Sequence, residues 1–210
     1  MSDERKPNLI TPMFRGSYCN LITPRVPGKK GAAQEGKDPK YSILIVLPKD
    51  DPDTDKFLKR LRVAIDEATT EKFGKPVAHQ KLKHFPIRDG DADDNEDFAG
   101  HWLIPASSKF KPGALDSKGQ KLFSEDQLYS GAWYRAAISV WAWDSDLGGR
   151  GVSVNLHNVL KEKDDTRFGG GTAAEDDFKA HIREDDDEED EEDEKPAPKK
   201  GKPSRGRNDF

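Results

Sequence analysis

Hydrophobic positions along the chain predict a body made mostly of strands. Residues Thr11–Val26 place apolar side chains at near-alternate positions until Pro24 and Pro27 end the pattern, as in a bent strand. Tyr41–Leu47 is almost wholly apolar and β-branched, which is typical of a strand covered on both faces. We therefore expect Tyr41–Leu47 to be a central strand, preceded by a Gly/Lys-rich loop over Gly28–Lys40.

One helix is predicted after the central strand. Asp51, Pro52 and Asp53 are the residue types of a helix start, and Gly74 and Pro76 are those of its end. Between them, apolar residues recur at helical spacing, at Phe57, Leu58, Leu61, Ala64, Ile65 and Ala68. The spacing predicts a helix with one apolar face.

The second half of the body reads as short segments. The patterns predict, in order, an extended piece at Leu82–Ile87, an acidic loop at Asp89–Asp97, a strand at His101–Ala106 and a loop at Lys109–Gly119. Gly131–Trp143 and Gly151–Leu160 form the clearest pair of strands, joined by the turn-rich segment Asp144–Arg150. We expect these two strands to be antiparallel neighbours.

These elements indicate the fold class. Several short strands with one helix favour a mainly β fold, an OB-fold Greek-key barrel, over an alternating α/β sheet. Pattern alone leaves an immunoglobulin-like sandwich open as an alternative. We expect a flexible N-terminus over residues 1–8, the folded domain over 9–168 and a disordered tail over 169–210.

The strand that begins near Ala132 has two contrasting faces. Its even positions suit a core, and its odd positions include Trp133, Arg135, Trp141 and Trp143. Aromatic rings stack on bases for about 1–3 kcal/mol each, and arginine attracts phosphate, so this face is typical of a platform for single-stranded nucleic acid. The alternative is that these indoles pack under a loop or against the helix.

Other basic and aromatic residues are candidates for the same groove, although each alone is more often a solvated charge or a core ring. They are Arg15, Arg25, Lys81, Lys83, Arg88, Trp102, Lys109, Phe110 and Lys111.

Charge divides the chain into two parts. Residues 1–168 carry a net charge of +2 and residues 169–210 one of −7, within a total of −5. The tail contains eleven consecutive acidic residues, which begin with Glu184, Asp185, Asp186, Asp187, Glu188, Glu189 and Asp190 and end at Glu194. They repel one another and cannot pack, so we expect a solvated interaction tail. A basic Pro-rich stretch, Lys195–Arg207, and the terminal Phe210 follow.

Several kinds of chemistry lack support in the sequence. Cys19 is the only cysteine, which excludes an internal disulfide and a Cys-x-x-Cys zinc site and fits a reducing cytoplasm. The acidic run from Asp89 fails as a calcium loop, because its sixth and twelfth positions are Asp94 and Gly100. We assign no metal, no cofactor and no catalytic residue. No 18-residue apolar run occurs, so we expect a soluble protein that does not enter a membrane.

Several segments between residues 40 and 178 resemble one known group. They are Leu47–Pro52, Ile87–Asp91, Gly100–Trp102, Ala106–Lys109, Tyr129–Gly131, Tyr134–Ala136, Gly151–Val159, Gly169–Gly171 and Ala174–Phe178. Because of the order and spacing of these segments, the chain resembles the phage-encoded single-stranded DNA-binding proteins with an OB-fold and an acidic tail, related to those of T-odd phages.

The resemblance implies a role and partners. It implies sequence-independent binding of single-stranded DNA in phage replication and recombination, in the cytoplasm of an infected bacterium, and a tail that contacts a polymerase or helicase. Binding of duplex DNA and homo-oligomerisation stay open. A tail of 42 residues has a span of about 32–39 Å, so we expect it to reach the groove of its own body and compete with DNA. The basic stretch Lys195–Arg207 departs from tails that stay acidic up to a terminal aromatic residue.

Two other functions stay open at this stage. Carboxylate density at Asp89, Asp91 and Asp93 is compatible with a metal-dependent nuclease or a strand-annealing protein. The acidic run by itself is compatible with a chaperone or decoy for basic proteins.

Overall fold

The computed structural model describes residues 8–26, 38–146 and 149–168. The elements in chain order are β1 (Leu9–Ile10), β2 (Phe14–Arg25), β3 (Lys40–Pro48), α1 (Pro52–Phe73), η1 (His79–Lys81), β4 (Arg88–Asp89), η2 (Gly90–Ala92), η3 (Glu96–Phe98), β5 (His101–Ser108), β6 (Gly113–Asp116), β7 (Trp133–Ser145) and β8 (Gly149–Lys163). The tail and most of the N-terminal segment predicted to be flexible lie outside the described residues.

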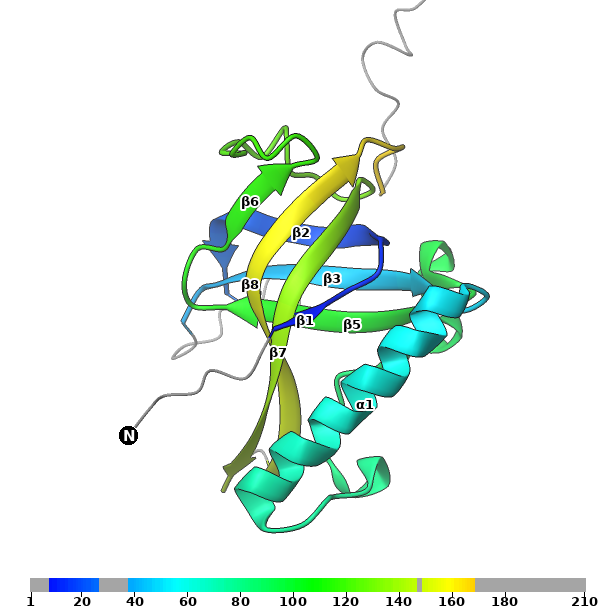
Figure 1. Ribbon diagram of the computed structural model, residues 1–210, viewed down its shortest axis with the longest axis vertical. Helices are drawn as coiled ribbons and strands as arrows, with labels where there is room; N and C mark the ends of the chain where they lie inside the picture. The colour runs from blue at the N-terminus through cyan, green and yellow to red at the C-terminus, as the bar shows by residue number, and fades with distance from the viewer. Residues whose placement is uncertain (1–7, 27–37, 147–148, 169–210) are drawn as a thin grey trace, which may run out of the picture. The chain divides into compact units, whose positions relative to one another are not determined.

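The strands form one sheet that closes on itself. β3 lies between β2 and β5, β5 pairs in parallel with β8, and β7 pairs antiparallel with β8 along its length. β7 closes the circle by pairing with β2 through Phe14↔Tyr134 and Arg15↔Trp133. This circular order, β2-β3-β5-β8-β7, is that of an OB-fold barrel (Figure 1), and the described strands all belong to one sheet, unlike the two sheets of a sandwich.

The central strand β3 is buried on both faces, as its apolar run predicts. Ile43, Ile45 and Leu47 point into the main core, and each is at most 1% exposed. Leu44 and Val46 point outward and are covered by a second, smaller cluster with Phe98 and Leu103. Since side chains alternate along a strand, this coverage explains why β3 lacks the usual polar positions.

The helix has the predicted limits. The Asp51 side chain accepts a hydrogen bond from the Asp53 amide, Pro52 follows in the first turn, and Gly74 ends α1 with φ 78°. Phe57, Leu58, Leu61 and Ile65 are buried in the main core. α1 lies alongside the β7–β8 hairpin, past the end of the barrel (Figure 1). No helix in the described part of the chain is long and apolar enough to cross a membrane.

Three sequence predictions need correction. Lys109–Gly119 is not a continuous loop, because Gly113–Asp116 forms β6 against the edge of β8. Leu82–Ile87 contributes only a single bridge, His84↔Gly151. The acidic loop begins within β4 and contains the short helices η2 and η3. In each case the structure depends on pairing with a strand far away in sequence or on a capping side chain. Neither leaves a periodic pattern of hydrophobic residues in the sequence.

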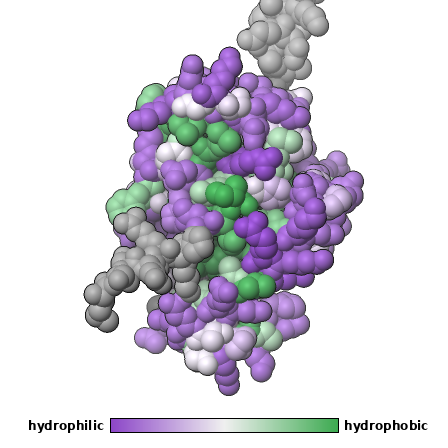
Figure 2. Space-filling model, viewed as in Figure 1, coloured by the Kyte–Doolittle hydropathy of each residue, from purple (hydrophilic) through white to green (hydrophobic). Residues whose placement is uncertain are grey.

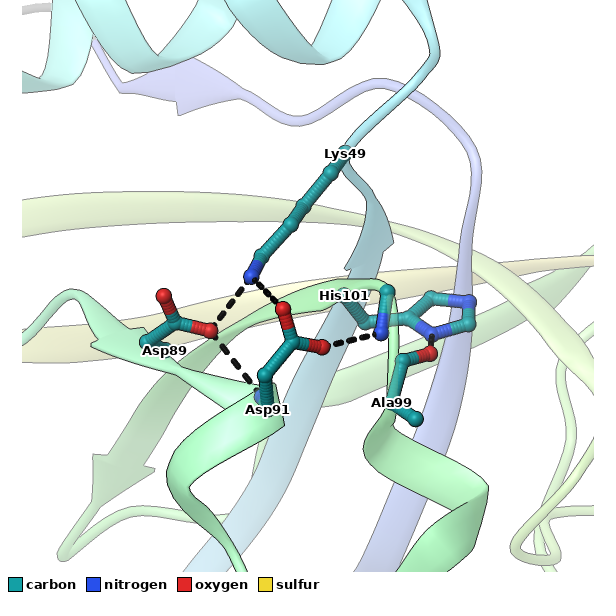
Figure 3. Close-up of polar contacts among 6 residues, drawn as sticks. Lys49, Asp89, Asp91, Ala99 and His101 are labelled. Atoms are coloured by element: carbon teal, nitrogen blue, oxygen red, sulfur yellow. Dashed lines mark hydrogen bonds and ion pairs between the residues drawn. The ribbon is translucent and has the colours of Figure 1, made fainter.

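Lys49 holds the segment that contains β4, η2 and η3 against the end of β3 (Figure 3). Lys49 Nζ donates hydrogen bonds to Asp89 Oδ1 and, at 2.6 Å, to Asp91 Oδ2. Asp91 Oδ1 accepts a third hydrogen bond, at 2.5 Å, from the Gly100 amide. These bonds join the end of β3 to both ends of the segment between β4 and β5, which carries Phe98 over the outer face of the sheet.

The hydrogen bonds from Lys49 hold the pKa values of Asp89 and Asp91 below the usual range of a carboxyl group. A carboxyl whose pKa is lowered in the folded state stabilises that state above its unfolded pKa, about 3.9, and loses this effect as the pH falls through the folded pKa. Lys49→Met should therefore lower the urea midpoint at pH 7, and the difference from wild type should shrink below about pH 4.

Lys118→Met serves as the control for this prediction. It removes the charge of an exposed lysine in the turn after β6 and should leave the midpoint unchanged. A Lys49→Met effect of equal size at neutral and acid pH would show that lost packing, and not the carboxyl contacts, causes the change.

Candidate nucleic-acid interface

The alternation predicted for β7 is present in the structure. Tyr134, Ala136 and Ile138 are at most 2% exposed and lie in the main core. The odd positions from Trp133 to Trp143 point outward and are at least partly accessible. Trp133 and Trp141 are eight residues apart, or about 26 Å along the strand, so the predicted platform has two ends with different surroundings.

The first end is the hairpin-tip cluster, which consists of Lys83, His84, Trp141 and Trp143. The Trp141 side chain is among the exposed large apolar groups, at 44%. Trp143 is held in place, because its Nε1 donates to Ser153 Oγ at 2.9 Å and the His84 ring lies 5.3 Å from its own. The cluster therefore offers one accessible indole beside a fixed one.

A glycine makes room for the fixed indole. A Cβ atom added to Gly151 would lie 2.4 Å from Trp143 Cζ2, so the ring crosses directly over the β8 backbone. The segment before β4 docks beside it, since Lys83 N donates to the Arg150 carbonyl and Val152 N donates to the His84 carbonyl. These bonds bring Lys83 to the tip of the hairpin, where its side chain lies near Gly149.

The second end is the Arg15 cluster, which consists of Arg15, Trp133, Asp165 and Phe168. The Arg15 guanidinium lies 4.5 Å from the Phe168 ring centroid and 5.6 Å from that of Trp133. It also pairs with Asp165 Oδ2 at 3.3 Å, and Trp133 Nε1 donates to the same oxygen at 2.6 Å. The Trp133 hydrogen bond is the main cause that holds the pKa of Asp165 below its usual range.

The other polar side chains at this end of β7 also have partners within the chain. Arg135 Nε pairs with Glu162 Oε1 at 2.6 Å. The Tyr129 hydroxyl donates to Asp164 Oδ1 at 2.6 Å, and Lys161 Nζ pairs with the same carboxylate at 2.6 Å. The chain after β8 is thus fastened across the start of β7. Three carboxylates pair with Arg15, Arg135 and Lys161, whereas Lys163 and Arg167 lie over the Trp133 and Tyr129 rings.

The other predicted residues fall outside these two clusters. Trp102 packs on the main core with Lys49 Nζ 4.9 Å from its ring centroid. Lys109 pairs with Asp38 at 3.0 Å, and Phe110 is 83% exposed beside it in sequence. Exposed positions are also held by Lys111 after β5, Arg25 at the end of β2, Lys81 in η1 and Arg88 in β4. The structure does not gather all the predicted residues into one groove.

The sequence analysis did not single out two exposed aromatic residues, Tyr18 and Phe123, and Tyr18 has the more informative surroundings. Tyr18 is 63% exposed, and its ring meets that of Phe98 edge-on at 6.3 Å. Its φ of 47° is uncommon for a side chain of this size and indicates local strain. Asn20 secures this bulge in β2, since its Nδ2 donates to the Tyr18 carbonyl and to Ser42 Oγ. The only signal in the sequence was an aromatic residue where alternation breaks down.

The carboxylates considered for a nuclease have structural roles. Asp89 and Asp91 are bound by Lys49, and Asp93 Oδ1 accepts from the Asn95 amide. No group of metal-binding side chains is found within the described ranges. The acidic residues from Glu184 onward, and Phe210, lie outside the described residues.

The chain is similar to known phage proteins. Residues 7–192 match the family model described as the single-stranded DNA-binding protein of Enterobacter phage Enc34. Putative protein p50 of Acyrthosiphon pisum secondary endosymbiont phage 1 is 28% identical over 148 residues, which cover 66% of this chain and 78% of that protein.

Solved structures are also similar. The single-stranded DNA-binding protein of bacteriophage Enc34 in complex with single-stranded DNA aligns with a TM-score of 0.65 and 28% identity, over 76% of this chain and 88% of that one. The single-stranded DNA-binding protein gp2.5 of bacteriophage T7 aligns with a TM-score of 0.51 and 17% identity, over 84% of this chain and 94% of that one, which supports the fold alone.

These matches decide the class of protein. The family consists of DNA-binding proteins that are not enzymes, as the sequence led us to expect. Because the family model matches most of the chain, the protein belongs to the family of phage single-stranded DNA-binding proteins represented by that of Enterobacter phage Enc34.

Proposed function

We propose that this protein binds single-stranded DNA without sequence preference and that the hairpin-tip cluster is its main stacking site. The observation that carries the proposal is the exposed Trp141 indole next to the fixed Trp143, with Lys83 on the same hairpin tip. Every base has a face that can stack, so such a site does not select a sequence. The complex of the similar Enc34 protein with single-stranded DNA supports this ligand.

The proposed DNA path follows the ligand face of OB-folds, which is the outer surface of the second and third barrel strands between two loops. Those strands are β3 and β5 here. Since Phe98 covers Leu44, Val46 and Leu103 on this face, the proposed path crosses over that cover. At one end lie Arg25, Lys109 and Phe110, because Arg25 pairs with Lys40 and β5 ends at Ser108 opposite Tyr41. At the other end is the hairpin-tip cluster.

Tyr18 belongs to the middle of this path in our proposal. Its neighbour Ser17 pairs with Leu44 of β3, and its ring contacts Phe98, which covers the outer face of β3 and β5. Tyr18 therefore supplies a third aromatic surface between the two ends. Arg88 pairs with Leu103 on the same face and is suited to contact phosphate.

We assign the Arg15 cluster a different role. Asp165 already accepts from both Arg15 and Trp133, and Glu162 already pairs with Arg135, so phosphate would have to displace these carboxylates. We propose that Trp133, Arg135 and Arg15 fasten the segment after β8 and set the point from which the chain continues toward the tail. The proposed DNA site thus contains fewer residues of β7 than the sequence pattern indicated.

The biological setting that we propose follows the family resemblance. The protein coats single strands during phage DNA replication and recombination in the infected bacterium. Its acidic run from Glu184 to Glu194, with Phe210 at the end, recruits replication proteins such as a polymerase or helicase and competes with DNA for the groove. The basic Lys195–Arg207 stretch adds a second contact for phosphate or for acidic partners.

Replacing both tryptophans of the hairpin tip tests the stacking site. Trp141→Ala/Trp143→Ala should weaken binding to oligo-dT by at least about tenfold, since each stacked base contributes about 1–3 kcal/mol. Fluorescence anisotropy at several salt concentrations measures the affinity, and thermal melting checks the fold. Trp133→Phe, on the same face of β7, is the control and should bind like wild type. Equal losses in both variants would contradict the narrower site.

Tyr18 can be tested by a set of three substitutions. Tyr18→Phe keeps the ring and should retain affinity, whereas Tyr18→Ala should weaken oligo-dT binding by about five- to tenfold. Tyr18→Gly removes the ring but suits a φ of 47°, so it should lose affinity without losing stability. Unchanged binding in the Gly variant would remove Tyr18 from the DNA path.

Removing the tail tests its regulatory role. Deletion of residues 179–210 removes a net negative charge and should tighten oligo-dT binding several-fold in low salt, with a smaller gain in high salt. A full-length variant in which residues 184–194 are replaced by serine and glycine should reproduce the gain. If neither change affects affinity, the tail does not compete with DNA.

A further inference from the structure

The outer face of α1 borders an apolar groove that the proposed DNA site does not use. The groove holds about 400 Å³ and lies between α1, β1 and β7, where it is lined by Leu9, Arg60, Val63, Ala64, Glu67, Ala68, Ser139 and Val140. Val63 is 56% exposed and Ile10, on β1, is 51% exposed. Figure 2 shows this apolar surface in green over β1 and α1, between charged residues on either side.

In the middle of α1, charged residues are sorted by sign around Val63, with Lys56, Lys59, Arg60 and Arg62 before it and Asp66, Glu67 and Glu71 after it. The two ends of the helix carry the opposite signs, with Asp53 and Asp55 in the first turn and Lys72 in the last. Cations placed before acids are the less favourable order for pairs within one helix, so helix stability does not account for the arrangement. Lys56 pairs with Asp53, but neither Arg60 nor Glu67 forms an ion pair with another described residue.

This arrangement is complementary to itself. When two such helices lie antiparallel about a two-fold axis between Val63 and Ala64, residue 60 of one faces residue 67 of the other, and residue 56 faces residue 71. Arg60 then meets Glu67 of the partner subunit, and Glu67 meets the partner's Arg60. A two-fold interface repeats each contact twice, which doubles the effect of every complementary pair.

We propose that α1 and the adjoining groove form a homodimer interface in which α1 packs antiparallel against α1 of a second copy of this chain. Val63 and Leu9 supply the apolar centre, and the Arg60 and Glu67 pairs lie on its rim, as in other protein interfaces. The exposed pairs make association weaken as salt rises. The second copy is the occupant that this charge order favours, because an unrelated partner would not need charges of opposite sign at equal distances on the two sides of the axis between Val63 and Ala64.

The test is sedimentation equilibrium of the full chain without DNA, over a wide range of protein concentration and in low and high salt. Wild type should dimerise reversibly and more weakly in high salt. Arg60→Glu and Glu67→Arg should each weaken dimerisation by about tenfold or more, because each turns two attractive contacts into two repulsive ones. The double variant Arg60→Glu/Glu67→Arg should recover the wild-type association constant.

A control separates this interface from general charge effects. Lys118→Glu makes the same change in charge as Arg60→Glu, but on the turn after β6, and should leave dimerisation unchanged. A wild-type chain that stays monomeric at all concentrations overturns the proposal. So does a double variant that associates no better than the two single ones. The measurement uses no DNA, so its outcome is independent of the proposed stacking site.

Discussion

Closure of the barrel by β7 is the constraint on which the rest of the structure depends. β7 pairs with β8 along its whole length and with β2 only at its start, where Phe14 lies opposite Tyr134. The buried Tyr134 hydroxyl donates to the Tyr129 carbonyl at 2.8 Å, which satisfies the one polar atom that this ring brings into the core. Because even positions of β7 must face inward, its odd positions are committed to the outside.

The same strand also extends past the barrel. Beyond Ile138 the hairpin continues to its tip, and α1 covers the inner face of this extension. The outer face there is left for Trp141 and Trp143, next to Lys83. The first half of β7 belongs to the barrel and the second half projects from it, so one face of the strand carries both the Arg15 cluster and the hairpin-tip cluster that we propose as the DNA site.

Polar partners distinguish the two clusters more clearly than residue type does. Trp133 and Trp143 are both indoles with a bonded Nε1, but the Trp133 ring sits among Arg15, Lys163 and Asp165, which are paired or stacked within the chain. At the hairpin tip, Trp143 is fixed by a neutral Ser153 hydroxyl. The nearby Asp144 pairs with Arg150 at 3.3 Å, and Lys83 forms no ion pair with another described residue. Burial and pairing therefore assign one cluster to structure and suit the other to an anionic ligand.

The sequence by itself determined the strands with strong periodicity, the capped helix, the mainly β class and the outward face of β7, because these depend on local spacing and local capping. The choice of a closed barrel over a sandwich depended on the long-range pairing of β2 with β7. Tertiary structure alone decided that β6 pairs with the edge of β8, that Tyr18 is exposed in a strained bulge, and that Asp165 lies against Arg15 and Trp133. Those contacts join residues up to about 150 positions apart. No local pattern encodes them, because they arise only when the closed sheet brings distant segments together.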